Sequence, residues 1–346
     1  MRCRFIFFLL LAVSGINAQD VNFSQSYVSG PYMNPALSGM FNGFVRVSTL
    51  YREQGRGGFD TPFKTYAVSS DIRYKFNIFN KFSADILGIG LYFLNDRMEV
   101  YDFNTNTIAL SLAFHKSLGF RTKQYIGLGF QGGIVQKNIN FENLTFEDMY
   151  NKVDAFSFPT REPVPSNNFA VGDFSLGLYY TITPSNRMFI AAGVAYQHFA
   201  QPNISFYRTE ENFDNTSKLF PKLTFHAMMD MKVSSFGKLQ PRIKVLSQGP
   251  YADYMVGTNY RISSFDKDYI SFHLGLNLHA IKDLESFGIG PVVPVIGMQV
   301  RNFMMGFSYD IVMSHLANSR KNLNTFEFTF SYLGEIEDEG LICPQF

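Results

Sequence analysis

Histidine has the widest chemical repertoire of the residues in this chain, because its ring titrates near neutral pH and binds metals. The sequence contains six histidines, and His273 and His279 fall on the same face of one alternating segment. Six residues correspond to about 20 Å along a strand, which is too far for both rings to bind one metal ion. We therefore expect polar lining of an interior at these positions, and we predict no metal site.

One segment formally matches a nucleotide-binding pattern. The residues "GLGFQG" at 127–132 satisfy G-x-G-x-x-G. A phosphate cradle needs those glycines between a strand and the N-terminus of a helix. Here Ile126, Leu128 and Phe130 alternate with small residues straight through the motif. We interpret the segment as a strand, and we predict no cofactor.

A hydrolase would need a nucleophile that is held against a base. A Ser or Asp side chain would have to meet one of four histidines, which are His115, His198, His226 and His273. No local signature marks such a pair, so we predict no catalytic residues. An outer-membrane enzyme is the least favoured functional class.

The composition indicates an apolar environment. Aromatic residues make up 16% of the chain and charged residues 17%, against about 25% charged residues in ordinary soluble proteins. The formal net charge of +1 argues against a nucleic-acid partner. After the first 20 residues no stretch reaches the ~18 apolar residues of a membrane-spanning helix. Only helices and closed barrels satisfy every backbone group in lipid, so a membrane protein of this composition must be a β-barrel.

Alternation of apolar residues with polar or small ones supports that fold. In "YISFHLGLNLHA" (269–280), Leu274 and Leu276 point one way and Asn277 the other. We expect the second face to line a wet lumen. A soluble β-sandwich also alternates, but its polar face would carry more long charged side chains. We predict an all-β, transmembrane antiparallel up-and-down barrel of about 14 strands, at 42–53, 63–76, 85–95, 104–117, 123–136, 169–183, 186–199, 219–233, 239–247, 252–262, 268–281, 289–299, 302–313 and 323–333.

The connections between these strands alternate in length. The even-numbered ones are tight, whereas two odd-numbered ones, 137–168 and 200–218, are the longest. An even strand count places both chain ends on the periplasmic side, so the long connections should face outward. The weakest strand is 289–299, because Pro291 and Pro294 cannot donate ladder hydrogen bonds.

The chain divides into four parts. Arg2 and Arg4 precede a short apolar run, and the pattern predicts a signal peptide that ends near Ala18. The next part has neither helical nor strand periodicity and can fill a polar lumen, where Asn34 would cap its own backbone two residues on. A disordered remnant is the alternative to such a plug or contact segment. The predicted parts are a signal peptide (1–18), an N-terminal plug or contact segment (19–41), the outer-membrane barrel (42–334) and an acidic C-terminal tail (335–346).

Inward-facing charges of the predicted barrel have mixed sign. A lumen that steers one class of solute would be biased to one sign. The mixture therefore predicts ion pairs across the lumen and a filled interior. The residues concerned are Arg46, Asp71, Arg73, Lys75, Lys222, Asp230, Lys232, Arg261, Asp310 and Glu327.

The sequence resembles the PorP/SprF family of the type IX secretion system in Bacteroidota. The resemblance begins in "QDVNFSQSYVSGPYMNPALSG" and continues in "VRVSTLYREQ", "YQHFAQP", "GFSYDIVMSHL", one residue of the last strand and the terminal "CPQF". It departs from the family pattern at two positions. This chain has Gly55 where the family usually has an aromatic residue, and Phe326 where the family has a histidine before the glutamate. The matching positions are Phe23, Ser24, Gln25, Asn34, Pro35, Ala36, Gly39, Tyr51, Arg52, Gln54, His198, Pro202, Ser308, Tyr309, Asp310, Ser314 and Glu327.

The resemblance implies a non-enzymatic outer-membrane barrel that works with the type IX apparatus. It implies a role in secretion or surface attachment of cargo, such as gliding adhesins that carry a C-terminal sorting domain. The implied partners are outer-membrane lipid, that cargo and periplasmic ring or peptidoglycan-associated proteins, with no nucleic acid. The alternative function is an outer-membrane transport channel for small or apolar solutes, since fourteen strands can enclose a ligand-sized lumen.

Overall fold

The computed structural model describes residues 20–334 apart from several short segments. Those segments are 57–60, 77–83, 100–101, 119–122, 142–143, 152, 154, 208–216, 264–269, 284–285 and 314–323. The predicted signal peptide (1–18), the predicted tail (335–346) and Ser314 therefore lie outside the described residues.

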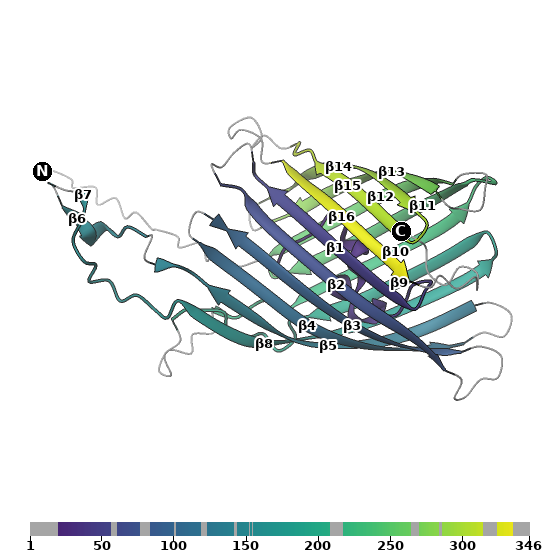
Figure 1. Ribbon diagram of the computed structural model, residues 1–346, viewed down its shortest axis with the longest axis horizontal. Coiled ribbons are helices and arrows are strands. Elements are labelled where there is room, and N and C mark those ends of the chain that lie inside the picture. The colour runs from purple at the N-terminus through teal and green to yellow at the C-terminus, as the bar shows by residue number, and fades with distance from the viewer. Residues whose placement is uncertain are drawn as a thin grey trace, which may run out of the picture.

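The described chain forms a closed antiparallel barrel of fourteen strands (Figure 1). Each barrel strand pairs with the next barrel strand along the chain, so β5 pairs with β8. The barrel closes where β1 pairs with β16. The predicted fold class is confirmed, and each predicted barrel strand is present within a few residues. The strands are β1 (Val45–Gln54), β2 (Phe63–Phe76), β3 (Asp85–Met98), β4 (Phe103–Ser117), β5 (Lys123–Asn138), β8 (Asn168–Ser185), β9 (Met188–Gln197), β10 (Lys222–Lys232), β11 (Gly237–Gln248), β12 (Tyr251–Ser263), β13 (Ile270–Lys282), β14 (Phe287–Val300), β15 (Phe303–Asp310) and β16 (Thr325–Gly334).

The alternation of β13 separates a lipid-facing side from a lumen-facing side. Leu274 and Leu276 are 54% and 45% exposed, whereas His273 and Asn277 are buried at 1% and 0%. Successive strand residues point to opposite faces, so one period-2 pattern serves both environments. The face assignment is confirmed, but the expectation of a wet lumen at Asn277 is wrong, because that side chain is fully buried.

The two prolines of β14 lie where its ladder with β15 is incomplete. Continuous pairing with β15 begins at Val295, directly after Pro294, and only an isolated bridge joins Val292 to Ile311. A proline is tolerated at such a position because the missing N–H is not needed by a neighbouring strand. This explains why the weakest predicted strand still forms.

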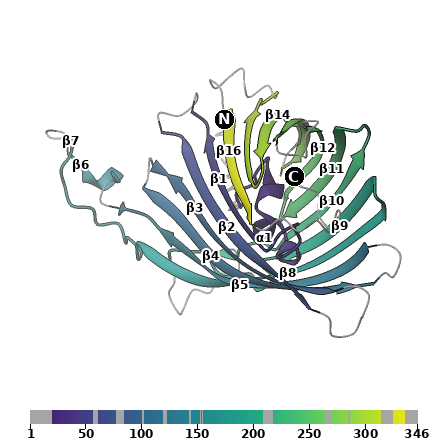
Figure 2. The same cartoon turned by 45° about the vertical axis from the view of Figure 1, so that its right-hand side comes forward.

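The connection predicted as an outward loop at 137–168 contains structure that the sequence did not indicate. Two short strands, β6 (Tyr150–Asn151) and β7 (Ala155–Phe156), pair with each other after a 3-10 turn, η5 (Glu147–Met149). This hairpin projects away from the barrel wall (Figures 1 and 2). Its strands were missed because each is only two residues long.

The segment before β1 lies inside the barrel and contributes no strand to it (Figure 2). It consists of three short helical turns, which are η1 (Ser26–Val28), α1 (Gly30–Met33) and η2 (Pro35–Leu37). In the part of the chain that the structure describes, no helix is long and apolar enough to cross a membrane.

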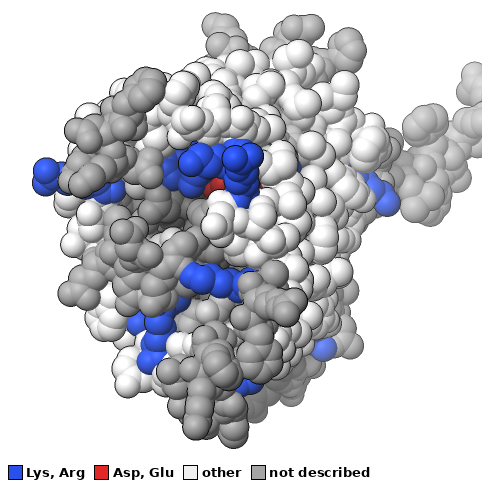
Figure 3. Space-filling model, turned by 90° about the vertical axis from the view of Figure 1, so that its right-hand side faces the viewer, with Lys and Arg blue, Asp and Glu red and all other residues white. Residues whose placement is uncertain are grey.

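Basic side chains gather at the barrel end where the short connections lie. Figure 3 looks onto this end and shows Lys and Arg side chains among its described residues. Lys123, Arg187 and Lys232 are exposed there, whereas Asp85 is buried and pairs with Lys116 at 2.8 Å. The cations at the strand ends and turns of this end are Lys75, Lys116, Lys123, Arg187, Lys232, Lys238 and Arg301.

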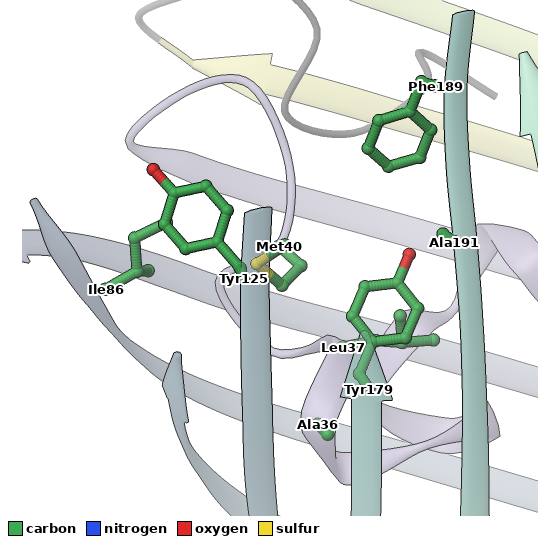
Figure 4. Close-up of a cluster of buried hydrophobic side chains, with 8 residues drawn as sticks. All are labelled: Ala36, Leu37, Met40, Ile86, Tyr125, Tyr179, Phe189 and Ala191. Atoms are coloured by element: carbon green, nitrogen blue, oxygen red, sulfur yellow. The ribbon is translucent and has the colours of Figure 1, made fainter. Parts of the chain in front are cut away.

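The hydrophobic core of the protein sits between the inner segment and the barrel wall. In one cluster, Leu37 and Met40 of the segment pack against Tyr179 and Phe189 of β8 and β9 (Figure 4). In a second cluster, Phe23 lies in edge contact with Tyr32, at 5.3 Å between ring centres. Burial of apolar area, worth about 25 cal/mol per Å², therefore holds the segment in place before any polar contact is counted.

Candidate functional site

The Asn34-Pro35 turn docks the segment against the wall. The Asn34 side chain accepts a hydrogen bond from the Ala36 N–H at 2.9 Å, as expected, and Pro35 starts η2. The same amide donates to the carbonyl oxygens of Leu178 at 3.2 Å and Val194 at 3.3 Å. One polar side chain thus shapes the turn and ties it to both β8 and β9.

Glycines of the wall make this close approach possible. Gly39 of the segment itself has φ +77°, a conformation that favours glycine. A Cβ added at Gly177 would lie 2.0 Å from the Asn34 Oδ1, and one added at Gly129 would lie 2.3 Å from the Ala36 nitrogen. Sequence reasoning missed Gly129 and Gly177, because a glycine in a strand gives no sign of what approaches it.

Glu327 holds the start of the segment. Its two carboxylate oxygens accept the backbone N–H groups of Ser24 and Gln25, each at 2.9 Å. Arg52 lies 3.5 Å from the same carboxylate, which is fully buried. A buried carboxylate needs such donors, since an unpaired one is strongly destabilising.

The Ser24 and Gln25 side chains continue this network. The Ser24 hydroxyl donates to Asp310 at 2.9 Å, and the Gln25 amide donates to Ser308 at 3.1 Å. Phe23 packs beside them and is fully buried. Positions almost 300 residues apart in the family pattern are therefore brought together, at the junction of the segment with β15 and β16.

Two ion-paired groups fix the end of the segment. Arg46 and Asp71 pair through bonds of 2.9 Å, and Asp71 also accepts the Gly39 N–H at 2.8 Å. Arg73 donates to the Phe41 carbonyl at 2.8 Å. We expected ion pairs across the lumen, but Arg46 and Asp71 are direct register partners on β1 and β2. Asp71 and Arg73 form hydrogen bonds to the segment, because the segment occupies the space between the walls.

His198, directly after β9, binds the first described residue. Its Nε2 lies 2.6 Å from Asp20, and its Nδ1 lies 2.9 Å from Asp173. Lys222 also contacts Asp20, at 2.8 Å. Sequence reasoning gave His198 no such partners, because Asp20 is 178 residues away in the chain.

The pKa values of this pair favour the ionised forms. Burial alone would lower the pKa of His198, but the charge of Asp20 and the hydrogen bonds to Asp173 and Asp20 raise it to about 9. Burial alone would raise the pKa of Asp20, but the charges of His198 and Lys222 hold it well below its usual value. At neutral pH both groups are therefore charged and attract each other.

Other matching positions lie outside these contacts with the segment. The Tyr51 hydroxyl donates to Glu53 at 2.8 Å, and the Pro202 carbonyl accepts the Leu219 N–H. Tyr309 is 39% exposed and accepts a bond from Asn324. Gln54 lines a cavity at the barrel mouth. The structure gives Tyr51, Pro202 and Tyr309 local roles in the wall and loops.

The remaining histidines contact the segment or the lumen. His115 contacts the Ser38 carbonyl at 3.0 Å, and His226 lies 3.1 Å from the Asn34 amide. In the described residues, no group of three or more His, Cys, Asp and Glu side chains is arranged to hold a metal ion. His115, His198 and His226 hold polar groups of the segment.

A closed fourteen-stranded barrel with an apolar outer face and a filled lumen is an outer-membrane β-barrel protein. The sequence profile described as "Type IX secretion system membrane protein PorP/SprF" matches residues 16–332. The chain therefore belongs to the PorP/SprF family. The family is described as a membrane component of a secretion system, which is a non-enzymatic kind of protein.

The chain is also similar to several solved structures. A Pseudomonas aeruginosa FadL homologue is 10% identical with a TM-score of 0.46, covering 86% of this chain and 92% of that one. The TodX monoaromatic hydrocarbon channel deltaS2 mutant is 10% identical with a TM-score of 0.48, covering 88% and 93%. The Ralstonia pickettii toluene transporter TbuX is 9% identical with a TM-score of 0.46, covering 88% and 93%. No curated protein matches the chain. These identities and scores support no inference about function.

Proposed function

We propose that this barrel is a non-enzymatic component of the type IX secretion system that assists secretion or surface attachment of cargo, such as adhesins. In this proposal its N-terminal segment, residues 19–41, is a plug, and the plugged barrel also contacts the periplasmic machinery. The observation that carries the proposal is the contact set of Glu327 with Ser24 and Gln25. Family-matching residues meet there and hold the segment in the lumen.

The alternative is a channel for small or apolar solutes. That function needs a continuous path, so the segment would have to leave the lumen or a passage would have to run beside it. Buried hydrogen bonds to charged groups are worth about 1.5–3 kcal/mol each, and several hold the segment at both ends. Such docking favours a plug that stays in place.

The basic end of the barrel supports the contact with the machinery. If the long connections face outward, the end with Lys123, Arg187 and Lys232 faces the periplasm. Complementary charge raises the association rate and selects partners. We therefore infer that the machinery presents acidic side chains to these described cations.

Affinity purification from native membranes tests the proposed function. A tag in the β6–β7 hairpin lies outside the barrel wall and away from the inner segment. The proposal expects a protein with a C-terminal sorting domain, or a periplasmic ring or peptidoglycan-associated protein, to co-purify with the barrel. Purification of a folded barrel that carries neither, together with passage of small solutes through reconstituted barrel, would favour the channel.

A further inference from the structure

A second polar site lies beside the inner segment, at the barrel end with the long connections. It is a cavity of about 370 Å³, within the ~300–1,000 Å³ typical of small-ligand sites. Solvent reaches it past Asp283 and Ser286, which are exposed. The lining includes Arg52, Tyr251, Asp253, His279, Ile289 and Asp310.

Carboxylates outnumber cations around this cavity. Arg52 lies 3.5 Å from Glu327, and Lys244 lies 3.9 Å from Asp253. Asp310 is only 6% exposed and accepts the Ser24 hydroxyl, but it forms no ion pair with a cation of the described chain. A buried carboxylate is stabilised when a positive charge approaches it, so the cavity has room and charge for a cation.

His279 supplies an independent observation. Its Nδ1 lies 2.8 Å from Asp253, so this nitrogen donates its hydrogen to the carboxylate. In the neutral ring Nε2 then carries a lone pair, and it has no hydrogen-bond partner among the described residues. The residue is only 7% exposed and lines the cavity. A buried acceptor of this kind needs a donor, which a bound molecule can supply.

Apolar residues also line the cavity, namely Ile281, Ile289, Pro291 and Val312. We propose that this cavity binds a guanidinium or primary ammonium group carried on a short apolar stem. The charged head donates hydrogen bonds to Asp310 and to the Nε2 of His279, and the stem lies along the apolar wall. The source is either an arginine or lysine side chain of a polypeptide or a free amine. Binding at this cavity does not require that the protein acts in secretion.

Calorimetric titration of the purified full-length barrel in detergent with agmatine tests the proposal. Saturable binding is expected for agmatine and none for a neutral alcohol of similar length. Asp310→Asn keeps an oxygen that can accept the Ser24 hydroxyl but removes the charge, and it should weaken binding about tenfold or more. Asp102→Asn is the matched control, because Asp102 pairs with Arg97 outside the cavity and undergoes the same charge change.

A second variant separates the site from the docking of the segment. His279→Phe keeps a ring but removes the acceptor, and Asp253 retains its bond from Asn22 at 2.6 Å. It should also weaken agmatine about tenfold or more. Heat-modifiable migration on gels checks that each variant is folded. No saturable binding by the wild-type barrel, or wild-type affinity in both folded variants, would overturn the proposal. Tighter binding of an arginine-containing peptide than of agmatine assigns the site to a polypeptide side chain, and the reverse order assigns it to a free amine.

Discussion

Glu327, in the strand that closes the barrel, accepts the backbone N–H of Ser24, which lies 303 residues earlier in the chain, at 2.9 Å. Because β16 pairs with β1 and β15, this bond links the segment to the last closure of the barrel. This contact of the segment can therefore form only when β16 is in place. This relationship makes Glu327 the first residue to test.

Removing the Glu327 carboxylate should loosen the segment. Glu327→Ala loses hydrogen bonds from Ser24 and Gln25, each worth about 1.5–3 kcal/mol, and leaves Arg52 without this partner. A Ser29→Cys reporter in a background with Cys3→Ser and Cys343→Ser, which removes both native cysteines, should then react faster with maleimide, since Ser29 is buried in the wild type. Glu327→Gln, which retains one acceptor oxygen, should give an intermediate rate. Equal rates in all three proteins would contradict the assigned role of Glu327.

A methyl group at Gly177 should also displace the segment. Its Cβ would lie 2.0 Å from the Asn34 Oδ1, and overpacking of this kind costs about 1–3 kcal/mol. Gly172 lies on the same strand, but its Cβ would meet only the Phe174 ring at 3.7 Å. Gly177→Ala should therefore raise Ser29→Cys labelling, and Gly172→Ala should leave it unchanged. The same labelling for both alanine variants would show that the close approach is unimportant.

Docking of Asp20 should depend on pH. The raised pKa of His198 means that its contribution is fully present below about pH 6.5 and is lost as pH rises through about 9. The lowered pKa of Asp20 means that its contribution is present above about pH 3.8 and is lost only in stronger acid. Since the chain has no tryptophan, Val21→Trp reports this site by fluorescence. A transition near pH 9 is expected, and His198→Gln should abolish it. Persistence of the transition in that variant would assign it to another group.

The outer face of β13 should reject charge. Leu276→Arg is expected to cost about 2–4 kcal/mol near the membrane midplane, whereas Leu276→Phe should have little effect. Urea titration of barrels folded into lipid vesicles measures both. Asn277→Arg should also destabilise the barrel, by about 1–3 kcal/mol, because Asn277 is fully buried. Unchanged stability of Leu276→Arg would contradict the assigned lipid face.

The barrel was predictable because alternate residues of each strand face two different environments, the lipid and the barrel interior. Lipid outside and packed polar groups inside impose a period of two on β13, and the same pattern recurs in the other strands. The Asn34 turn was also predictable, since an Asn-Pro pair forms a local bond that needs no distant partner.

The docking contacts were not predictable in the same way. Asp20 meets His198 and Ser24 meets Glu327 only after barrel closure sets which strands lie opposite the segment. Gly177 has no side chain to signal the approach of Asn34. Ser24 was singled out in the sequence only because it matches the family pattern. That pattern does not say which of the matching residues contact one another.

Deletion of residues 21–40 tests the central claim most directly. The segment contributes no strand, so the barrel should still fold and show heat-modifiable migration. Capture of partners and display of cargo at the cell surface should fail, since the lumen loses its docked plug. Loss of the barrel itself would make the segment a structural element. A folded barrel with undiminished cargo display would contradict the claim that the docked segment is needed for function.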